Sequence, residues 1–222
     1  MRHFLQELEE LQHKLLEMAG LVESAIHRSV QALVERADQH AEEVLRNEAR
    51  INQLEIEIDD AATRLLALQQ PMARDLRLIT AAIKINSDLE RMGDLAVNIV
   101  ERALDLAKAP QVKPLIDIPK MGKLAESMVR KSLDAFVKRD ADLARSVLLV
   151  DDSVDELRTA VHLELVEFMQ QDPSVVPQAV DLLLVSRHLE RIADHATNIA
   201  EDILFLVKGI DVRHHAESLT NK

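Results

Sequence analysis

The chain has 222 residues, of which 47% are hydrophobic and 30% charged, a balance typical of a soluble protein that buries a core. Its formal net charge of −12 and its aromatic content of 2% argue against nucleic acid as a partner, because phosphates would be repelled and few rings are offered for stacking. The absence of cysteine excludes disulfides, thiolate zinc sites and cysteine catalysis.

The first residues, MRHFLQELEELQH, are amphipathic and acidic and do not resemble a signal peptide. No uncharged apolar run approaches the roughly 20 residues that a membrane-spanning helix needs. We therefore expect a cytoplasmic protein. Its acidic surface is suited to divalent or trivalent cations, or to a basic patch on another protein.

Three long helices are predicted in the first half. Leu8, Leu11 and Leu15 begin a series of apolar residues at alternating steps of four and three, which is the pattern of a helix that packs one face. Asp38 is the expected cap of the second helix, and Pro71 marks the turn before the third. The predicted helices are residues 2–37, 41–70 and 73–108.

Three of the six prolines lie in residues 110–119, which predicts a linker there. Further helices are predicted at residues 120–138, 141–170 and 173–207, followed by a polar tail. The expected domains are a bundle over residues 1–109, the linker over 110–119, a second bundle over 120–208 and the tail over 209–222.

The two halves are predicted to be copies of one unit. Glu90–Glu101, ERMGDLAVNIVE, returns 100 residues later as Glu190–Glu201, ERIADHATNIAE, with seven of the twelve positions identical. The helices are long and no β-branched runs separate them, so parallel α/β units are disfavoured. We predict an all-α protein of two tandem antiparallel three-helix bundles packed against each other.

Acidic and amide side chains recur at helical spacing in both copies. Residues four apart lie on one side of a helix, and carboxylate and amide oxygens are the ligands that hard cations prefer. Rows on neighbouring helices would then meet at an interface and form a metal site in each copy, although a solvated acidic face remains the alternative. The candidate ligand pairs are Glu48 with Asn52, Glu90 with Asp94, Asp151 with Asp155, and Glu190 with Asp194.

The second copy departs from the first at three positions near these pairs. Arg158 and His162 stand where the first copy has Glu55 and Asp59, so the second site is expected to be less anionic, with His162 either a nitrogen ligand or an ordinary polar residue. Ala193 replaces Gly93, which is expected to crowd the second site.

The sequence offers little support for catalysis. The glycines are isolated, no triad spacing is found, and the single Glu-x-x-His match, Glu10 with His13, has no duplicate of the kind a diiron oxidase requires. We therefore predict a protein that is not an enzyme. Two alternatives remain open: a carboxylate-based metal store or metalloenzyme, and a metal-free helical scaffold.

Several segments resemble the PhoU family of phosphate-uptake regulators over nearly the whole chain. They are ERMGD at Glu90–Asp94, ERIAD at Glu190–Asp194, the continuation Asn-Ile-x-Glu in both copies, QQPMARDLRLI at Gln69–Ile79, and VKGIDVRH at Val207–His214. The resemblance implies two three-helix bundles and metal ligands at the same eight positions. The implied metals are iron or zinc, or other ions such as magnesium, calcium or nickel.

The implied function is negative regulation of the phosphate-starvation response. The resemblance implies an adaptor that couples a phosphate ABC transporter, through its ATPase subunit, to a membrane sensor histidine kinase. It also implies a homodimer that such partners recruit to the inner face of the membrane. Ala193, where the family has Gly, leaves the geometry of the second site open.

Overall fold

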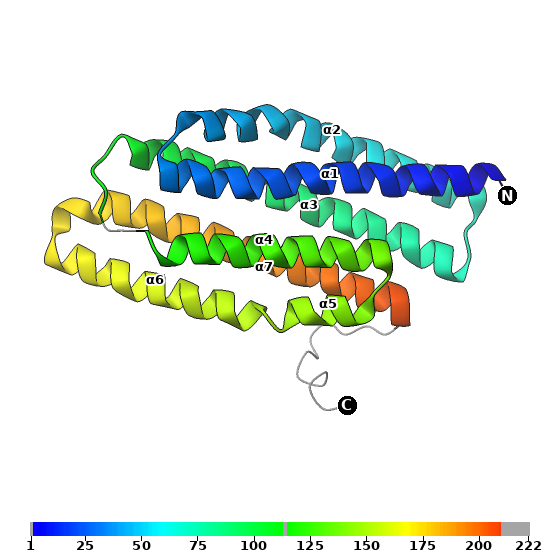
Figure 1. The fold of residues 1–222 in the computed structure, drawn as a ribbon. Coiled ribbons are helices and arrows are strands. Elements are labelled where there is room, and N and C mark those ends of the chain that lie inside the picture. The colour runs from blue at the N-terminus through cyan, green and yellow to red at the C-terminus, as the bar shows by residue number, and fades with distance from the viewer. Residues whose placement is uncertain (1, 113–114, 210–222) are drawn as a thin grey trace.

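The computed structural model describes residues 2–112 and 115–209, apart from the side chain of residue 2. Within these ranges the chain forms seven α-helices and one short 3-10 helix (Figure 1). No strand occurs in this part of the chain, and the predicted all-α fold is confirmed. None of its helices has the length and hydropathy needed to cross a bilayer. Except for Gly209, the predicted polar tail lies outside the described residues.

The first half consists of α1 (Arg2–Glu35), α2 (Asp38–Gln69) and α3 (Ala73–Ala107). The turn between α1 and α2 comes earlier than predicted. Arg36 adopts a left-handed conformation (φ 53°) and Ala37 is the N-cap, so Asp38 is the first helical residue and not the cap. An acidic side chain in a first turn interacts favourably with the helix dipole, which accounts for Asp38 at this place.

Arg36 also caps the C-terminal end of α3 with its side chain. Its guanidinium donates to the backbone carbonyls of Leu106 at 2.7 Å and Ala107 at 2.9 Å, and to that of Ala109. The last carbonyls of a helix have no partner within the helix, so this side chain satisfies acceptors that would otherwise need water. The turn between α1 and α2 is thereby joined to the start of the segment that connects the two halves.

The second half contains one helix more than predicted. Its elements are α4 (Asp117–Lys138), α5 (Ala141–Leu148), α6 (Asp151–Gln171), the 3-10 helix η1 (Pro173–Val175) and α7 (Val176–Lys208). The predicted helix over residues 141–170 is interrupted at Leu149 and Val150. Asp151 and Asp152 occupy the first turn of α6, where the helix dipole favours carboxylates. Leu149, at the interruption, is 65% exposed and is not part of the core.

The two halves join chiefly through α3 and α7, with α1 against α4 as a second contact. The central helices run antiparallel side by side (Figure 1). Lys84 binds Asp202 at 2.6 Å, and at the other end of the pair Arg102 binds Asp181 at 3.3 Å. Arg102 and Asp202 occupy equivalent positions in the two copies but carry opposite charges. Each forms an ion pair with an oppositely charged residue of the other copy.

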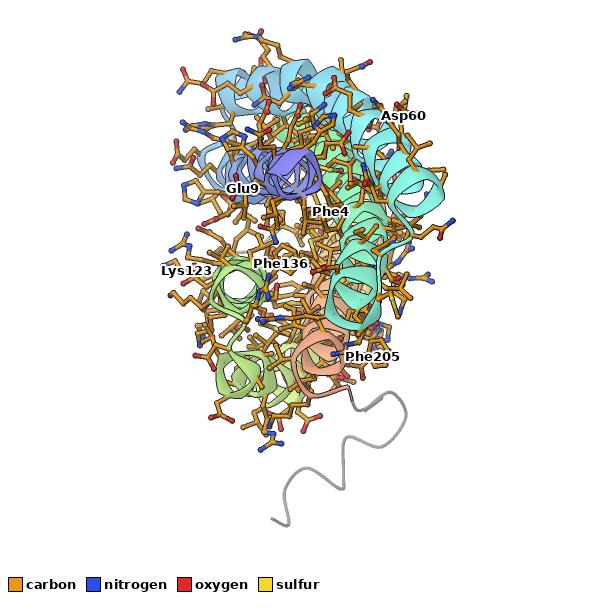
Figure 2. The ribbon with its side chains drawn as sticks, turned by 90° about the vertical axis from the view of Figure 1, so that its right-hand side faces the viewer. Phe4, Glu9, Asp60, Lys123, Phe136 and Phe205 are labelled. Atoms are coloured by element: carbon orange, nitrogen blue, oxygen red, sulfur yellow. The ribbon has the colours of Figure 1, made fainter. Side chains whose placement is uncertain are left out.

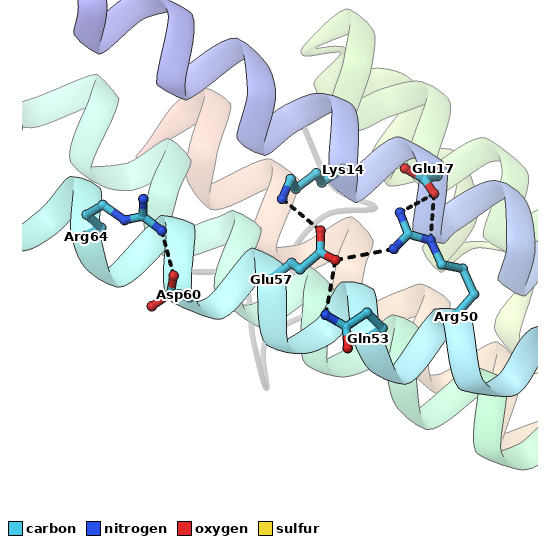
Figure 3. Close-up of polar contacts among 7 residues, drawn as sticks. All are labelled: Lys14, Glu17, Arg50, Gln53, Glu57, Asp60 and Arg64. Carbon is cyan, nitrogen blue, oxygen red and sulfur yellow. Dashed lines mark hydrogen bonds and ion pairs between the residues drawn. The ribbon is translucent and has the colours of Figure 1, made fainter.

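Seen along the helices, apolar side chains fill the interior and charged ones point outward (Figure 2). Phe136 is 4% exposed, whereas Asp60 and Lys123 lie on the outside. A polar network also fixes α2 against α1 (Figure 3). Glu57 accepts from Lys14 at 2.8 Å and from Arg50 at 3.3 Å, and Arg50 in turn binds Glu17 at 2.6 Å.

Candidate metal centre

The first acidic cluster lies between α2 and α3. Asp59 accepts a hydrogen bond from the amide of Asn86 at 2.9 Å, and Ile51 lies against Gly93. These contacts set an antiparallel register for the two helices. In this register Asn52 lies level with the turn that holds Glu90 and Asp94, and Glu48 lies one turn further along.

Glu90 is much less exposed than a residue on a solvated face would be. Its side chain is 16% exposed, against 40% for Asp94 on the next turn. Burial, and after it the charges of Asp94 and Glu55, raise the pKa of Glu90. Arg91 opposes this effect, with its Nε 3.4 Å from the Glu90 carboxylate. The carboxylates of the two helices therefore repel one another at a partly buried place.

The second cluster, between α6 and α7, shows stronger repulsion. Burial, together with the charges of Asp194, Asp155, Asp152 and Glu190, raises the pKa of Asp151 to about 6. Burial and Asp194 raise the pKa of Glu190, and burial and Asp155 raise that of Asp194. The structure thus brings all four residues named for the second site, on two helices, within electrostatic range of one another.

Arg158 partly offsets the repulsion in the second cluster. Its Nε lies 3.6 Å from the Glu190 carboxylate, and its charge lowers the pKa of both Glu190 and Asp194. His162, one turn further along α6, is exposed and has no ion pair or hydrogen bond to any described residue. The second cluster is therefore less anionic on one side, as the sequence indicates.

The side chains as they stand do not close around a point. Among the described residues, no three His, Asp or Glu side chains converge closely enough to hold an ion. Arg91 lies against Glu90 and Arg158 lies against Glu190, so each cluster already has a positive side chain beside one of its carboxylates. Of the eight residues named from the sequence, Glu90, Asp151, Glu190 and Asp194 have a raised pKa, as crowded carboxylates do. On α2 the charge that acts on Glu90 is that of Glu55, and the rotamers would have to change for the eight residues to share ions.

One polar cluster is not predicted by any pattern in the sequence. Asp88 accepts from Asn198 at 3.4 Å and contacts His195 Nδ1 at 2.8 Å, across the α3–α7 interface. Asn198 and His195 of α7 therefore both reach the Asp88 carboxylate of α3. The repeat gives no warning of this pairing, because the position equivalent to Asp88 is His188.

Gly93 serves helix packing. A Cβ at Gly93 would lie 3.3 Å from Ile51 Cγ2, tighter than usual contact. The second copy has Ala193 in place of Gly93, and Val154 at the position equivalent to Ile51; both residues are buried. A methyl group gained on one helix is thus matched by one lost on the other, which explains how the second copy accepts alanine without the crowding expected there.

The fold and clusters define a class of protein: a tandem duplication of a helical bundle with an acidic centre on the outer side of each copy. A family model described as the PhoU domain matches residues 15–103 and, a second time, residues 118–203. The chain belongs to the PhoU domain family. This confirms the resemblance and the internal duplication inferred from the repeated segment.

Relatives of similar length support the assignment. The chain is 41% identical to a Pseudomonas aeruginosa protein over 96% of this chain and 88% of that one. It is 43% identical to an Aquifex aeolicus protein over 94% and 95%. Both are named phosphate-specific transport system accessory protein PhoU homolog.

Solved structures of the family have the same fold. The crystal structure of PhoU from Pseudomonas aeruginosa superposes with a TM-score of 0.91 at 39% identity, covering 93% of this chain and all (100%) of that one. The phosphate transport system regulatory protein PhoU from Streptococcus pneumoniae gives 0.86 at 31% identity, covering 94% and 99%. The bundle arrangement is therefore shared across the length of the chain.

Proposed function

We propose that this chain is an accessory regulator of phosphate transport that represses the phosphate-starvation response when phosphate is plentiful. The observation that carries the proposal is the match, over nearly full length, to relatives named as accessory proteins of a phosphate-specific transport system. The partners proposed are the ATPase subunit of a phosphate ABC transporter and a sensor histidine kinase. The proposed role is that of an adaptor, so assays of partner binding and of signalling test it, and assays of catalytic turnover do not.

The architecture is suited to an adaptor. Long helices with charged outer faces offer extended surfaces to more than one protein at a time. The α3–α7 pairing holds the two copies against each other through Lys84–Asp202 and Arg102–Asp181, so that a contact on one copy is held in a set orientation to a contact on the other.

A bound cation is the second part of the proposal. Glu48, Asn52, Glu90 and Asp94 would hold it in the first copy, and Asp151, Asp155, Glu190 and Asp194 in the second. Iron, zinc, magnesium, calcium and nickel are the ions to be compared. A bound ion would supply positive charge that offsets the repulsion now raising the pKa of Asp151 and Glu90. The residues would supply oxygens from two helices in each copy once their rotamers turned toward the ion.

Deletion of the gene tests the regulatory role. We expect alkaline phosphatase to be produced in phosphate-rich medium by the deletion strain, and repression to return with the wild-type chain supplied from a plasmid. Unchanged repression in the deletion strain would remove this function from consideration.

Metal titration tests the cation. Each ion added to chelator-treated protein should raise the melting temperature if it binds the folded state in preference to the unfolded one. The pair of substitutions Glu190→Gln and Asp194→Asn should abolish the part of the shift due to the second copy, and Glu164→Gln on the same bundle serves as a control. No shift with any of the ions would count against metal binding.

One observation favours a metal-free scaffold as the second candidate. Arg158 already compensates Glu190, and no three acidic or histidine side chains converge among the described residues. In that case Glu90→Gln with Asp94→Asn should leave repression unchanged, and excess metal should shift the melting temperature of neither this variant nor the wild type.

A further inference from the structure

The outer side of α1 and α4 presents the same pattern of residues twice. LVES at residues 21–24 of α1 returns as LAES at residues 124–127 of α4, so equivalent positions lie 103 residues apart. Glu23 accepts a hydrogen bond from Arg130 at 2.6 Å. Their equivalents, Glu126 and His27, meet at 3.1 Å. The two helices therefore run antiparallel about an approximate two-fold axis that passes between these contacts. We call this side, over residues 16–34 and 119–138, the α1–α4 face.

Large apolar side chains remain exposed at both ends of the α1–α4 face. Val34 is 46% exposed, and its equivalent Val137 is 55% exposed. Leu16 is 39% exposed. A groove of about 450 Å³ opens between the helices beside Val34, with Val30 and Pro119 in its lining. An apolar patch that both copies keep is the kind of exposed surface that marks a contact with another protein.

The charges of the α1–α4 face favour a second copy of the chain as that protein. The two stretches of the face hold six Lys and Arg against four Asp and Glu, although the whole chain has a net charge of −12. Two copies that approach through their acidic surfaces repel each other, whereas this face lacks the acidic excess. Asp134 binds Lys138 of the same helix at 3.1 Å. Lys123 forms no ion pair with a described residue and points outward (Figure 2).

We propose that two copies of this chain pair through their α1–α4 faces, about a two-fold axis that crosses the middle of both helices at right angles. This axis sets α1 antiparallel on the partner's α1 and α4 antiparallel on the partner's α4. Residues equally far from the middle then meet, so Leu16 lies over the partner's Val34 and Val137 covers the end of the partner's groove. Lys123 meets the carboxylate of the partner's Asp134. Each contact occurs twice, as in any isologous interface.

The apolar and charged contacts have different roles in this pairing. The exposed valines and the groove lose water on association and supply most of the affinity. The contact of Lys123 with the partner's Asp134 lies at the rim, where an ion pair adds little affinity but selects the orientation. The inference does not rest on the proposed function, since no step of it uses the transporter or the kinase.

Sedimentation equilibrium of the purified full-length chain measures the pairing. We expect the mass of two 25.0 kDa chains for the wild type. Val34→Asp and Val137→Asp should each weaken association about tenfold or more, because a carboxylate replaces an apolar contact that is made twice. Both positions are exposed in the single chain, so the melting temperature of dilute, unassociated protein should stay close to that of the wild type. Leu163→Asp, 65% exposed on α6, is the matched control and should associate as the wild type does.

A mixing experiment tests the orientation of the pair. Lys123→Asp places two carboxylates at each rim contact, and Asp134→Lys places two ammonium groups there, so each variant alone should associate more weakly at low salt. In a mixed pair both rim contacts join opposite charges. The mixture should therefore form heterodimers that are tighter than either homodimer, and added salt should reduce the difference.

Three results would overturn the inference. A wild-type chain that sediments as a single 25.0 kDa species at every concentration would leave the face without the proposed occupant. A dimer that Val34→Asp and Val137→Asp leave intact would form through another surface. A mixture of Lys123→Asp and Asp134→Lys that gives no preference for heterodimers would show that these two residues do not face each other.

Discussion

The ammonium nitrogen of Lys84 lies 2.6 Å from Oδ1 of Asp202, and this ion pair joins the two copies of the repeat through their central helices. The Asp202 side chain is 10% exposed and that of Lys84 is 40% exposed. The carboxylate is therefore largely removed from water, and the charge of the lysine offsets part of its desolvation.

Lys84→Met is expected to lower the free energy of unfolding by about 1–3 kcal/mol, because the largely buried Asp202 carboxylate loses a charged hydrogen-bond donor. Asp202→Asn in the same chain should recover part of the loss, because it removes the buried charge. Denaturant unfolding measures both. Arg64→Met is the control: it breaks the exposed pair with Asp60 seen in Figure 3 and should cost about 0.5 kcal/mol or less. Equal losses for the two variants would contradict the prediction.

Asp151 makes stability depend on pH. Its folded-state pKa is about 6, above its ordinary 3.8, so between these values the folded state binds the proton more tightly than the unfolded state does. Stability is therefore expected to fall as pH rises from about 4 to 6 and to stay lower above that range. In chelator, Asp151→Asn should match the wild type near pH 4 and exceed it at pH 7.5, as measured by urea unfolding.

The same residue gives a test of the cation with the opposite sign. A metal ion bound at the second cluster would favour ionised Asp151, so in excess metal Asp151→Asn should be the less stable protein at pH 7.5. An asparagine variant that stays more stable with and without metal would speak against a site that uses Asp151. Asp134→Asn, an exposed carboxylate paired with Lys138, is a control expected to show neither effect.

Gly93 and Ile51 should behave as a coupled pair. Gly93→Ala gains about 1 kcal/mol of helix propensity but brings its Cβ to 3.3 Å from Ile51 Cγ2, which opposes the gain. Ile51→Val alone leaves space and should cost about 0.5–1.5 kcal/mol. Together they reproduce the Ala193 and Val154 of the second copy, so the double variant should be more stable than the sum of the single changes. Strict additivity would show that the two helices do not meet at this point.

Gly122 permits the close approach of α4 to α1. A Cβ there would lie 2.8 Å from Val30 Cγ2, a distance that the stiff valine side chain cannot easily relieve. Gly122→Ala should therefore lower the free energy of unfolding by about 1–3 kcal/mol, and Val30→Ala in the same chain should relieve much of it. Gly20→Ala is the matched control: no atom lies within 4 Å of its Cβ, so it should stabilise by up to about 1 kcal/mol. Equal effects at the two glycines would contradict this packing.

The sequence by itself determined the fold class, the duplication and the helices that carry the candidate ligands. Periodic apolar residues select one buried face of each helix, and the repetition of ERMGD as ERIAD relates the halves, because both patterns are local and follow from helix geometry. The same geometry placed Glu90 with Asp94 and Glu190 with Asp194 on one side of their helices. Helix ends were less predictable, as Asp38 and the break at Leu149–Val150 show, since competing first turns differ by small free energies.

Only the tertiary structure decided how the two bundles meet and how much each carboxylate is buried. The pairing of Asp88 with His195, and of Lys84 with Asp202, depends on the register of α3 against α7, which no local pattern encodes. The burial that raises the pKa of Asp151, and the neighbouring Arg158 that relieves Glu190, likewise depend on which helices are adjacent. The spacing of residues along one helix fixes the direction in which their side chains point around its axis. The distance between side chains on different helices depends on how those helices pack against each other.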